Sequence, residues 1–303
     1  MIPLLEEYQL VVPRSLREAL DDLAQHPQAR PFAGGTDLMV VLEAGHLPPG
    51  RYVSLQNCRE LLGIERAREG VSIGALTTYS EIQRSPLLAD NYPLLRLAAL
   101  ETGGIATQNR GTIGGNVANA SPAADTPPVL LVYDAVLELV SASGTRRVPY
   151  VGFHRGYKKM DLQPGEIISR VLLPGVAGQG SRPAETVRAS VGRAFRPGDP
   201  IRSYYRKVGT RSAQAISKVC FAGLLHVEAD AVQDVRIALG SVAPTVIRAL
   251  ATEDALRGQP LDATTIAAAE RALLTEIAPI DDIRSNARYR GRVAANLLRE
   301  FLS

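Results

Sequence analysis

The sequence has few cysteines, no long apolar run and little excess charge, and each absence narrows the class of protein. Two cysteines, Cys58 and Cys220, are too few for a disulfide framework, an iron–sulfur cluster or a structural zinc site. No apolar stretch approaches the roughly 18 residues that would cross a bilayer. The 34 Lys and Arg exceed the 31 Asp and Glu by only three charges, which does not favour nucleic-acid binding. We therefore expect no membrane span, no nucleic-acid partner and no metal held by this chain.

The beginning of the sequence also lacks the features of a secretory signal. It has no basic segment, and acidic side chains occur already at Glu6 and Glu7. We therefore expect a cytoplasmic protein.

The length and the charge distribution indicate two domains. The chain has 303 residues, of which 46% are hydrophobic and 21% are charged, as in ordinary globular proteins. Residues 1–175 hold 16 basic and 18 acidic residues, whereas residues 176–303 hold 18 and 13. The change follows a segment rich in proline and glycine at 174–183. We place the boundary there and expect domains at 1–178 and 179–303.

Helical and strand patterns are mixed along the whole chain, which predicts an α+β fold. Ser15 stands before leucines at helical spacing and has Glu18 three positions on, as at the start of a helix. Further helices are expected at 92–100, 264–277 and 288–302. Alternating or short apolar runs predict strands at 29–33, 52–55, 71–74, 135–141, 219–228 and 234–239.

Several motifs of common enzymes are missing. The sequence contains no Gly-x-Gly-x-x-Gly, no Gly-Lys-Ser/Thr and no His-Glu-x-x-His. Nicotinamide or ATP sites built on those motifs are therefore disfavoured. The four histidines at 26, 46, 154 and 226 show no metal-ligand spacing and fit surface or core positions better. No catalytic residue is expected from these patterns.

Two glycine-rich segments are the features most typical of a ligand site. The first is Ala33-Gly34-Gly35-Thr36-Asp37-Leu38, and the second runs from Gly111 through Gly114-Gly115-Asn116 to Asp125. Paired glycines let the backbone approach a ligand and turn N–H groups outward as a nest for anions. Two tight turns are the alternative interpretation. Because the second segment holds fifteen mostly small or polar residues, the two together favour a site for a pyrophosphate.

These two segments resemble those of the FAD-binding subunits of molybdenum hydroxylases, the family of xanthine dehydrogenase and carbon monoxide dehydrogenase flavoproteins. The resemblance continues through Gly165–Ile168, Tyr205–Val219, Gly240–Thr245 and Asp282–Arg290, in the same order. It thus covers nearly the whole chain. It implies a two-part FAD-binding domain of the vanillyl-alcohol-oxidase-like (PCMH) type, followed by a C-terminal α+β domain of the carbon monoxide dehydrogenase flavoprotein type.

The resemblance implies FAD as cofactor and assigns it residues in both loops. In the family the first loop wraps the pyrophosphate and the second holds it from the other side. The matching residues here are Pro31, Phe32, Ala33, Gly34, Gly35, Thr36, Asp37 and Leu38, with Thr112, Ile113, Gly114, Gly115 and Asn116.

Four further positions are implied by the same resemblance. Asn119 lies on the second loop, and Asp125 matches an acid that hydrogen-bonds the ribityl region of the flavin. Ile168 matches an apolar position near the flavin ring, and Lys207 matches a lysine that approaches FAD across the domain interface. A cation there would stabilise a reduced, anionic flavin. A carboxylate that only braces its loop and a solvated lysine are the alternatives for Asp125 and Lys207. Thr102 stands where the family has an aromatic residue, so no stacking is expected there.

The implied function is that of an electron-transfer oxidoreductase subunit. Substrate is oxidised at molybdenum, and electrons pass through two [2Fe–2S] clusters to FAD and then to NAD or another acceptor. Two clusters require eight cysteine ligands, so we expect a small [2Fe–2S] subunit and a large molybdopterin subunit to complete a heterotrimer. The segments Ser241–Thr245 and Ile277–Ser285 resemble the xanthine dehydrogenase branch more than the carbon monoxide branch. The organic substrate, the acceptor and any pairing of two assemblies stay open.

Other interpretations are weighed beside this one. A stand-alone flavin-dependent oxidase or reductase of the same fold would need its own acid–base pair, and none is evident. A non-catalytic nucleotide-binding or interaction module that has lost the cofactor is the third interpretation, and the intact glycine loops argue against it. The segment 182–211 carries eight basic and two acidic residues, and Gln214, just after it, stands where some relatives carry an acid. It is either a solvated basic loop or a docking face for an acidic partner or an anionic acceptor such as NAD.

Overall fold

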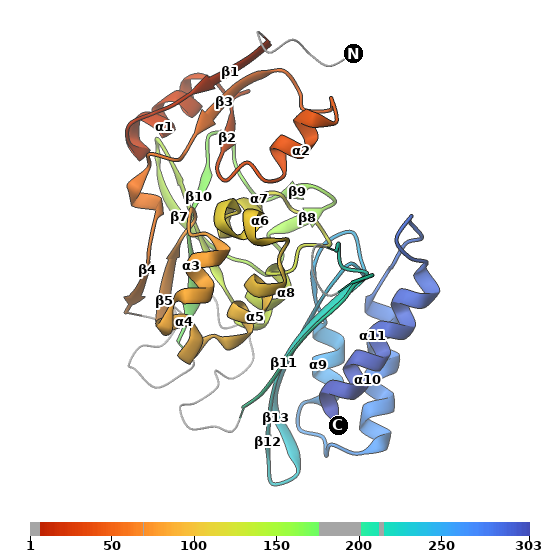
Figure 1. Ribbon diagram of the computed structural model, residues 1–303. Coiled ribbons are helices and arrows are strands. Elements are labelled where there is room, and N and C mark those ends of the chain that lie inside the picture. Colours follow the sequence, from red (N-terminus) through yellow and green to blue (C-terminus); the bar gives the residue numbers. More distant parts are fainter. Residues whose placement is uncertain (1–6, 69, 176–200, 212–214) are drawn as a thin grey trace.

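The protein consists of a larger N-terminal part and a C-terminal part that pack side by side (Figure 1). The computed structural model describes residues 7–68, 70–175, 201–211 and 215–303. The boundary expected between residues 178 and 179 lies outside the described residues. So do Gln214 and most of the basic segment at 182–211.

The chain begins with a small parallel sheet. Its strands have the order β1-β3-β2, with α1 and α2 in the connections. Ser15 begins α1 as expected, because its hydroxyl accepts a hydrogen bond from the Glu18 N–H at 3.2 Å. The elements are β1 (Tyr8–Val11), α1 (Leu16–Gln25), β2 (Arg30–Phe32), α2 (Leu38–Glu43) and β3 (Gly50–Ser54).

An antiparallel sheet and six short helices complete the N-terminal part. The sheet has the strand order β4-β5-β10-β6-β7, and the helices cover it. Its strands are β4 (Ile64–Ala67), β5 (Gly70–Gly74), β6 (Val136–Ser141), β7 (Gly144–Pro149) and β10 (Ile167–Pro174). The helices are α3 (Tyr79–Arg84), α4 (Pro86–Asn91), α5 (Pro93–Glu101), α6 (Ile105–Arg110), α7 (Ile113–Ala118) and α8 (Pro127–Val132). A separate hairpin is formed by β8 (His154–Gly156) and β9 (Lys159–Met160).

The C-terminal part is a four-stranded antiparallel sheet with three helices on one face (Figure 1). Phe221 of the sheet packs against Phe301 of the last helix, with ring centroids 5.6 Å apart. The strands are β11 (Ile201–Val208), β12 (Val219–Glu228), β13 (Ala231–Gly240) and β14 (Ile247–Arg248). The helices are α9 (Leu250–Leu256), α10 (Ala263–Glu276) and α11 (Ala287–Leu302).

The other face of this sheet packs on the N-terminal part. Ala222, Leu224 and Ala238 of the sheet share one hydrophobic cluster with Leu131 of α8. Helix α5 contacts β11, and α8 contacts β12, β13 and β14. One continuous core therefore joins the two parts.

The elements expected from periodicity are confirmed, with ends that differ by a few residues. Strand β12 has the expected bounds, and α10 and α11 each begin one residue earlier than expected. Cys58 and Cys220 are fully buried, and burial raises the pKa of the Cys58 thiol to about 11. Among the described residues, no helix combines the length and apolar character needed to cross a membrane.

Candidate functional site

A cavity of about 270 Å³ lies between the two glycine-rich segments and the start of β10. Thirteen of the seventeen residues expected to bind a cofactor line it. They are Pro31, Ala33, Gly34, Gly35, Thr36, Asp37, Leu38, Thr112, Gly114, Gly115, Asn116, Asn119 and Ile168. Residues far apart in the sequence are thus brought to one hollow.

The first loop, between β2 and α2, offers open backbone donors to this cavity. Gly35 has φ +75° and packs on the Phe32 ring, so that an added Cβ would lie 2.7 Å from Phe32 Cζ. Gly34 touches the other loop: a Cβ there would lie 1.9 Å from the Arg110 carbonyl oxygen. Within the described part of the chain, the N–H groups of residues 34–37 have no hydrogen-bond acceptor. Such a run of free donors is suited to an anion.

The second glycine-rich segment is not an open nest, contrary to our expectation. It forms the short helix α7, which Thr112 caps by accepting from the Gly115 N–H at 3.1 Å. The Gly114 N–H donates to the Ala75 carbonyl at 2.9 Å, and the Ile113 N–H donates to the Thr77 carbonyl at 3.0 Å. These donors are already used inside the protein. The segment contributes a close wall to the cavity rather than a second row of free N–H groups.

A chain of side-chain hydrogen bonds crosses the rim of the cavity where the two loops meet. Asn119 Nδ2 donates to Asp37 Oδ1 at 3.0 Å, and Lys158 Nζ donates to Asn119 Oδ1. Lys158 lies in the turn of the β8–β9 hairpin with φ +55°. The hairpin thereby brings a cation to the rim beside the Asp37 carboxylate.

The opposite wall is mainly apolar. Ile168 at the start of β10 lines it together with Leu55, Leu76 and Leu162. The carboxylate of Glu166 also faces this region and is held by Arg146, with 2.7 Å from Nε to Oε1. Hydrogen bonds from Arg146 keep the pKa of Glu166 below its usual range.

Asp125 and Lys207 are close together but do not line the cavity. Lys207 Nζ lies 2.8 Å from Asp125 Oδ2 and donates to the Glu101 carbonyl at 2.7 Å. Ser217 Oγ donates to Asp125 Oδ1 at 2.6 Å. Burial raises the pKa of the Asp125 carboxyl, and the charge and hydrogen bond of Lys207 oppose that change. The Lys207 side chain is only 3% exposed, so it is not a solvated lysine.

Two other expected residues also lie away from the cavity surface. Phe32 supports the first loop from beneath, and Ile113 is buried in the core. Several residues that line the cavity were not expected from the sequence, namely Leu55, Ala75, Leu76, Tyr79, Ala118, Leu162, Glu166 and Ile167. Ala118 and Ile167 are sequence neighbours of Asn119 and Ile168, so their place in the site could have been predicted. The other lining residues reach the cavity only through the topology of the fold. Among the described residues no group of three His, Cys, Asp or Glu side chains could hold a metal ion.

The fold and this site define a two-part protein that binds a nucleotide-type cofactor. A family model described as the FAD binding domain in molybdopterin dehydrogenase matches residues 6–176, and one for the CO dehydrogenase flavoprotein C-terminal domain matches residues 203–303. The chain therefore belongs to the family of FAD-binding medium subunits of molybdenum hydroxylases, which are oxidoreductases of the xanthine and carbon monoxide dehydrogenase type. FAD is its cofactor, as the resemblance implied.

Individual relatives agree with this assignment. The chain is 30% identical to the "Putative xanthine dehydrogenase FAD-binding subunit XdhB" of Escherichia coli, over 95% of this chain and 92% of that protein. It is also 30% identical to the "Glyceraldehyde dehydrogenase medium chain" of Sulfolobus acidocaldarius, over 95% and 94%. A carbon monoxide dehydrogenase structure from Hydrogenophaga pseudoflava superposes with a TM-score of 0.86, at 28% identity, over 99% of this chain and 96% of that one. The expected α+β architecture of two family domains is thereby confirmed.

Proposed function

We propose that this chain carries FAD in the cavity between the first loop and β10 and relays electrons inside a heteromeric molybdenum hydroxylase. The observation that carries the proposal is that residues 34–37, whose N–H groups have no acceptor within the described part of the chain, line a cavity whose far wall is apolar. A pyrophosphate needs many donors, and a flavin ring needs an apolar wall with few polar groups. The residues present fit both requirements.

Each group of residues has a separate task in this proposal. The first loop binds the diphosphate through its backbone, and Asn119 with Lys158 closes the rim over it. Ile168 and its apolar neighbours orient the ring and exclude water. When bound, FAD supplies the redox chemistry, while the protein provides position and electrostatics. Asp125 and Lys207 fix the C-terminal part against the wall of the site rather than contacting the cavity directly.

The proposal includes two companion subunits and an external acceptor. Two buried cysteines, on separate parts of the chain, cannot hold [2Fe–2S] clusters. A small iron–sulfur subunit would therefore deliver electrons, a large molybdopterin subunit would oxidise the substrate, and NAD or another acceptor would remove the electrons. Two unpaired thiols suit a reducing compartment, which supports a cytoplasmic location.

The visible absorption spectrum of the purified chain tests this proposal directly. We expect the absorption bands of oxidised flavin at about 370 and 450 nm, and release of FAD when the protein is denatured. We expect no turnover of an organic substrate until the iron–sulfur and molybdenum subunits are added. Turnover by this chain alone would indicate a stand-alone flavoenzyme instead. A colourless protein that takes up no added FAD would leave only a binding module.

A further inference from the structure

Helix α8 (Pro127–Val132) belongs to the N-terminal part and lies next to the C-terminal sheet (Figure 1). All six of its residues are buried, and it packs against β12, β13 and β14. A helix of this length spans about 9 Å. Its two ends therefore lie within one short, rigid element, and each end makes its own polar contacts.

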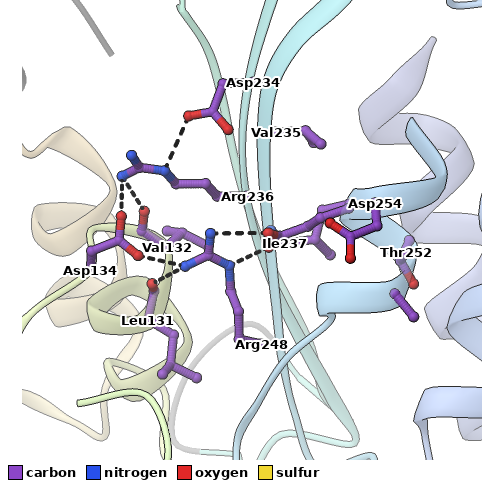
Figure 2. Close-up of polar contacts among 12 residues, drawn as sticks. Leu131, Val132, Asp134, Asp234, Val235, Arg236, Ile237, Arg248, Thr252 and Asp254 are labelled. Carbon is purple, nitrogen blue, oxygen red and sulfur yellow. Dashed lines mark hydrogen bonds and ion pairs between the residues drawn. The ribbon is translucent and has the colours of Figure 1, made fainter. Parts of the chain in front are cut away.

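The C-terminal end of α8 is held by two arginines of the C-terminal part (Figure 2). Helix ends carry carbonyls without partners inside the helix. Arg248 Nη1 donates to the Leu131 carbonyl at 2.9 Å, and Arg236 Nη1 donates to the Val132 carbonyl at 3.3 Å. Asp134, just after the helix, also binds both guanidinium groups, at 2.7 Å from Arg248 and 2.6 Å from Arg236. The two arginines thus bind three acceptors at this end of the helix, the carbonyls of Leu131 and Val132 and the carboxylate of Asp134, and we call this arrangement the clamp.

The two arginines are themselves fixed from the other side. Their side chains are only 3% and 8% exposed. Arg248 also binds the fully buried carboxylate of Glu253, which in turn accepts from the Ile237 N–H at 2.8 Å. Arg236 Nε lies 3.5 Å from Asp234 Oδ2. Buried cations with several fixed partners have little freedom to move, so the clamp sets the position of α8.

The N-terminal end of α8 reaches the cofactor cavity. Thr126, the residue before the helix, is fully buried, and its hydroxyl donates to Asn116 Oδ1 at 2.6 Å. Asn116 lines the cavity. The adjacent Asp125 binds Lys207. A displacement of α8 along its axis would therefore move a wall residue of the cavity.

We propose that Arg236 and Arg248 are positioning residues for the cofactor site, acting through α8 and Thr126 on Asn116. This inference rests on the proposed binding of FAD in this cavity. The arginines touch neither the cavity nor the cofactor. Their contribution is to hold Asn116, and with it this wall of the cavity, at the distance from the first loop that FAD requires.

Arg257 provides a matched control in the same ion cluster. Its guanidinium nitrogens lie 2.6 Å from Glu253 Oε2 and 2.7 Å from Asp254 Oδ1, and Nη2 donates to the Val235 carbonyl at 3.1 Å. All three partners belong to the C-terminal part. Replacing it removes buried ion pairs without removing a bond to α8. A comparison of R248M and R236M with R257M therefore separates loss of the clamp from general loss of stability.

The experiment is a titration of FAD onto the apoprotein of the full chain, followed by flavin fluorescence. We expect R248M and R236M to weaken FAD binding about tenfold, and R257M to leave the dissociation constant unchanged within about twofold. If R248M does not fold, R248K retains the charge but replaces the planar five-donor guanidinium with a compact ammonium that cannot reach all the separated acceptors at once, and it should weaken binding by a smaller factor. Equal dissociation constants for R248K, R236M and the wild type would overturn the inference.

A double-mutant cycle tests the route through Thr126. T126V removes the hydroxyl that reaches Asn116 and should itself weaken FAD binding. If the arginines act through that contact, adding R236M or R248K to T126V should cause little further loss, because coupled residues are not additive. Full additivity would contradict the route and indicate a purely structural role. A wild-type chain that binds no FAD would instead refute the cofactor site, and this inference with it.

Discussion

Lys207 and Asp125 form a buried ion pair, with 2.8 Å between Nζ and Oδ2, that joins two parts of the chain 82 positions apart. The pair stands behind the cavity wall, since neither residue lines the cavity. Ser217 and the Glu101 carbonyl satisfy further hydrogen bonds of the two charges. The pair is therefore a joint between the flavin-binding part and the C-terminal part.

Breaking this joint from one side should be costly. K207M leaves the Asp125 carboxylate buried without its cation, and we expect a loss of about 3–5 kcal/mol in the free energy of unfolding. In the double variant D125N/K207M no charge is left unpaired, so it should be less destabilised than K207M alone. Urea denaturation of K207M, D125N and the double variant measures these losses in the free energy of unfolding. A double variant as unstable as the sum of the two single variants would show that the residues do not interact.

The rim lysine should contribute to cofactor affinity through its charge. Lys158 donates to Asn119 at the mouth of the cavity, where FAD would place its diphosphate. We expect K158M to weaken FAD binding about two- to fivefold at low salt, and the difference from the wild type to shrink as salt is added. The neighbouring Lys159 is exposed, and no hydrogen bond joins it to the cavity residues within the described part of the chain, so K159M serves as the control. A loss of affinity in K158M that does not depend on salt would rule out the electrostatic role.

The contact between the two loops at Gly34 should not tolerate a side chain. A Cβ at this position would lie 1.9 Å from the Arg110 carbonyl oxygen, so the backbones must separate. We expect G34A to lower the free energy of unfolding by about 1–3 kcal/mol and to abolish tight FAD binding. G156A is the matched control, because nothing lies within 4 Å of a Cβ added at Gly156. Equal urea midpoints for the two variants would disprove the close approach.

His154 should make stability depend on pH. Its Nε2 lies 2.9 Å from the Val117 carbonyl at the end of α7, and burial lowers the pKa of the imidazole. The unfolded state, with a histidine pKa of about 6.5, then binds a proton that the folded state does not. The stabilisation by neutral His154 is therefore complete above about pH 6.5 and is lost as the pH falls toward its folded-state pKa.

Comparison with H154N isolates that contribution. We expect the difference in unfolding free energy between the wild type and H154N to be larger at pH 7.5 than at pH 5.5. Y150F, which alters a ring packed against His154 without titrating in this range, should show a difference that is independent of pH. If the H154N difference grew on acidification, the neutral, buried state of His154 would be wrong.

Much of the fold could be predicted because its longer elements carry their periodicity in the sequence. The leucines of α1 and the apolar runs of β12 and β13 are examples. Helix α7 could not be predicted, since Gly114 and Gly115 disfavour a helix by themselves. It is formed by the Thr112 cap and by hydrogen bonds to Ala75 and Thr77, which only the tertiary structure brings near.

The candidate site shows the same division. The first loop was recognisable because its glycines, small residues and position after a strand are local features. The partnership of Asn119 with Lys158 spans 39 residues and depends on where the β8–β9 hairpin folds back. Which residues of the second loop keep free donors depends on neighbours such as Ala75, so the resemblance named the residues without giving their hydrogen bonds.

Helix α8 also has a consequence for how the chain folds as it is synthesised. Its apolar side chains are covered by strands β12 and β13, the first of which begins only at Val219. Until β12 and β13 have left the ribosome, the nearly finished N-terminal part exposes this helix and lacks the arginines that bind its last two carbonyls. A fragment ending near residue 175 should therefore aggregate rather than accept the cofactor. The flavin-binding part is thus completed only after the chain has been synthesised through Arg248.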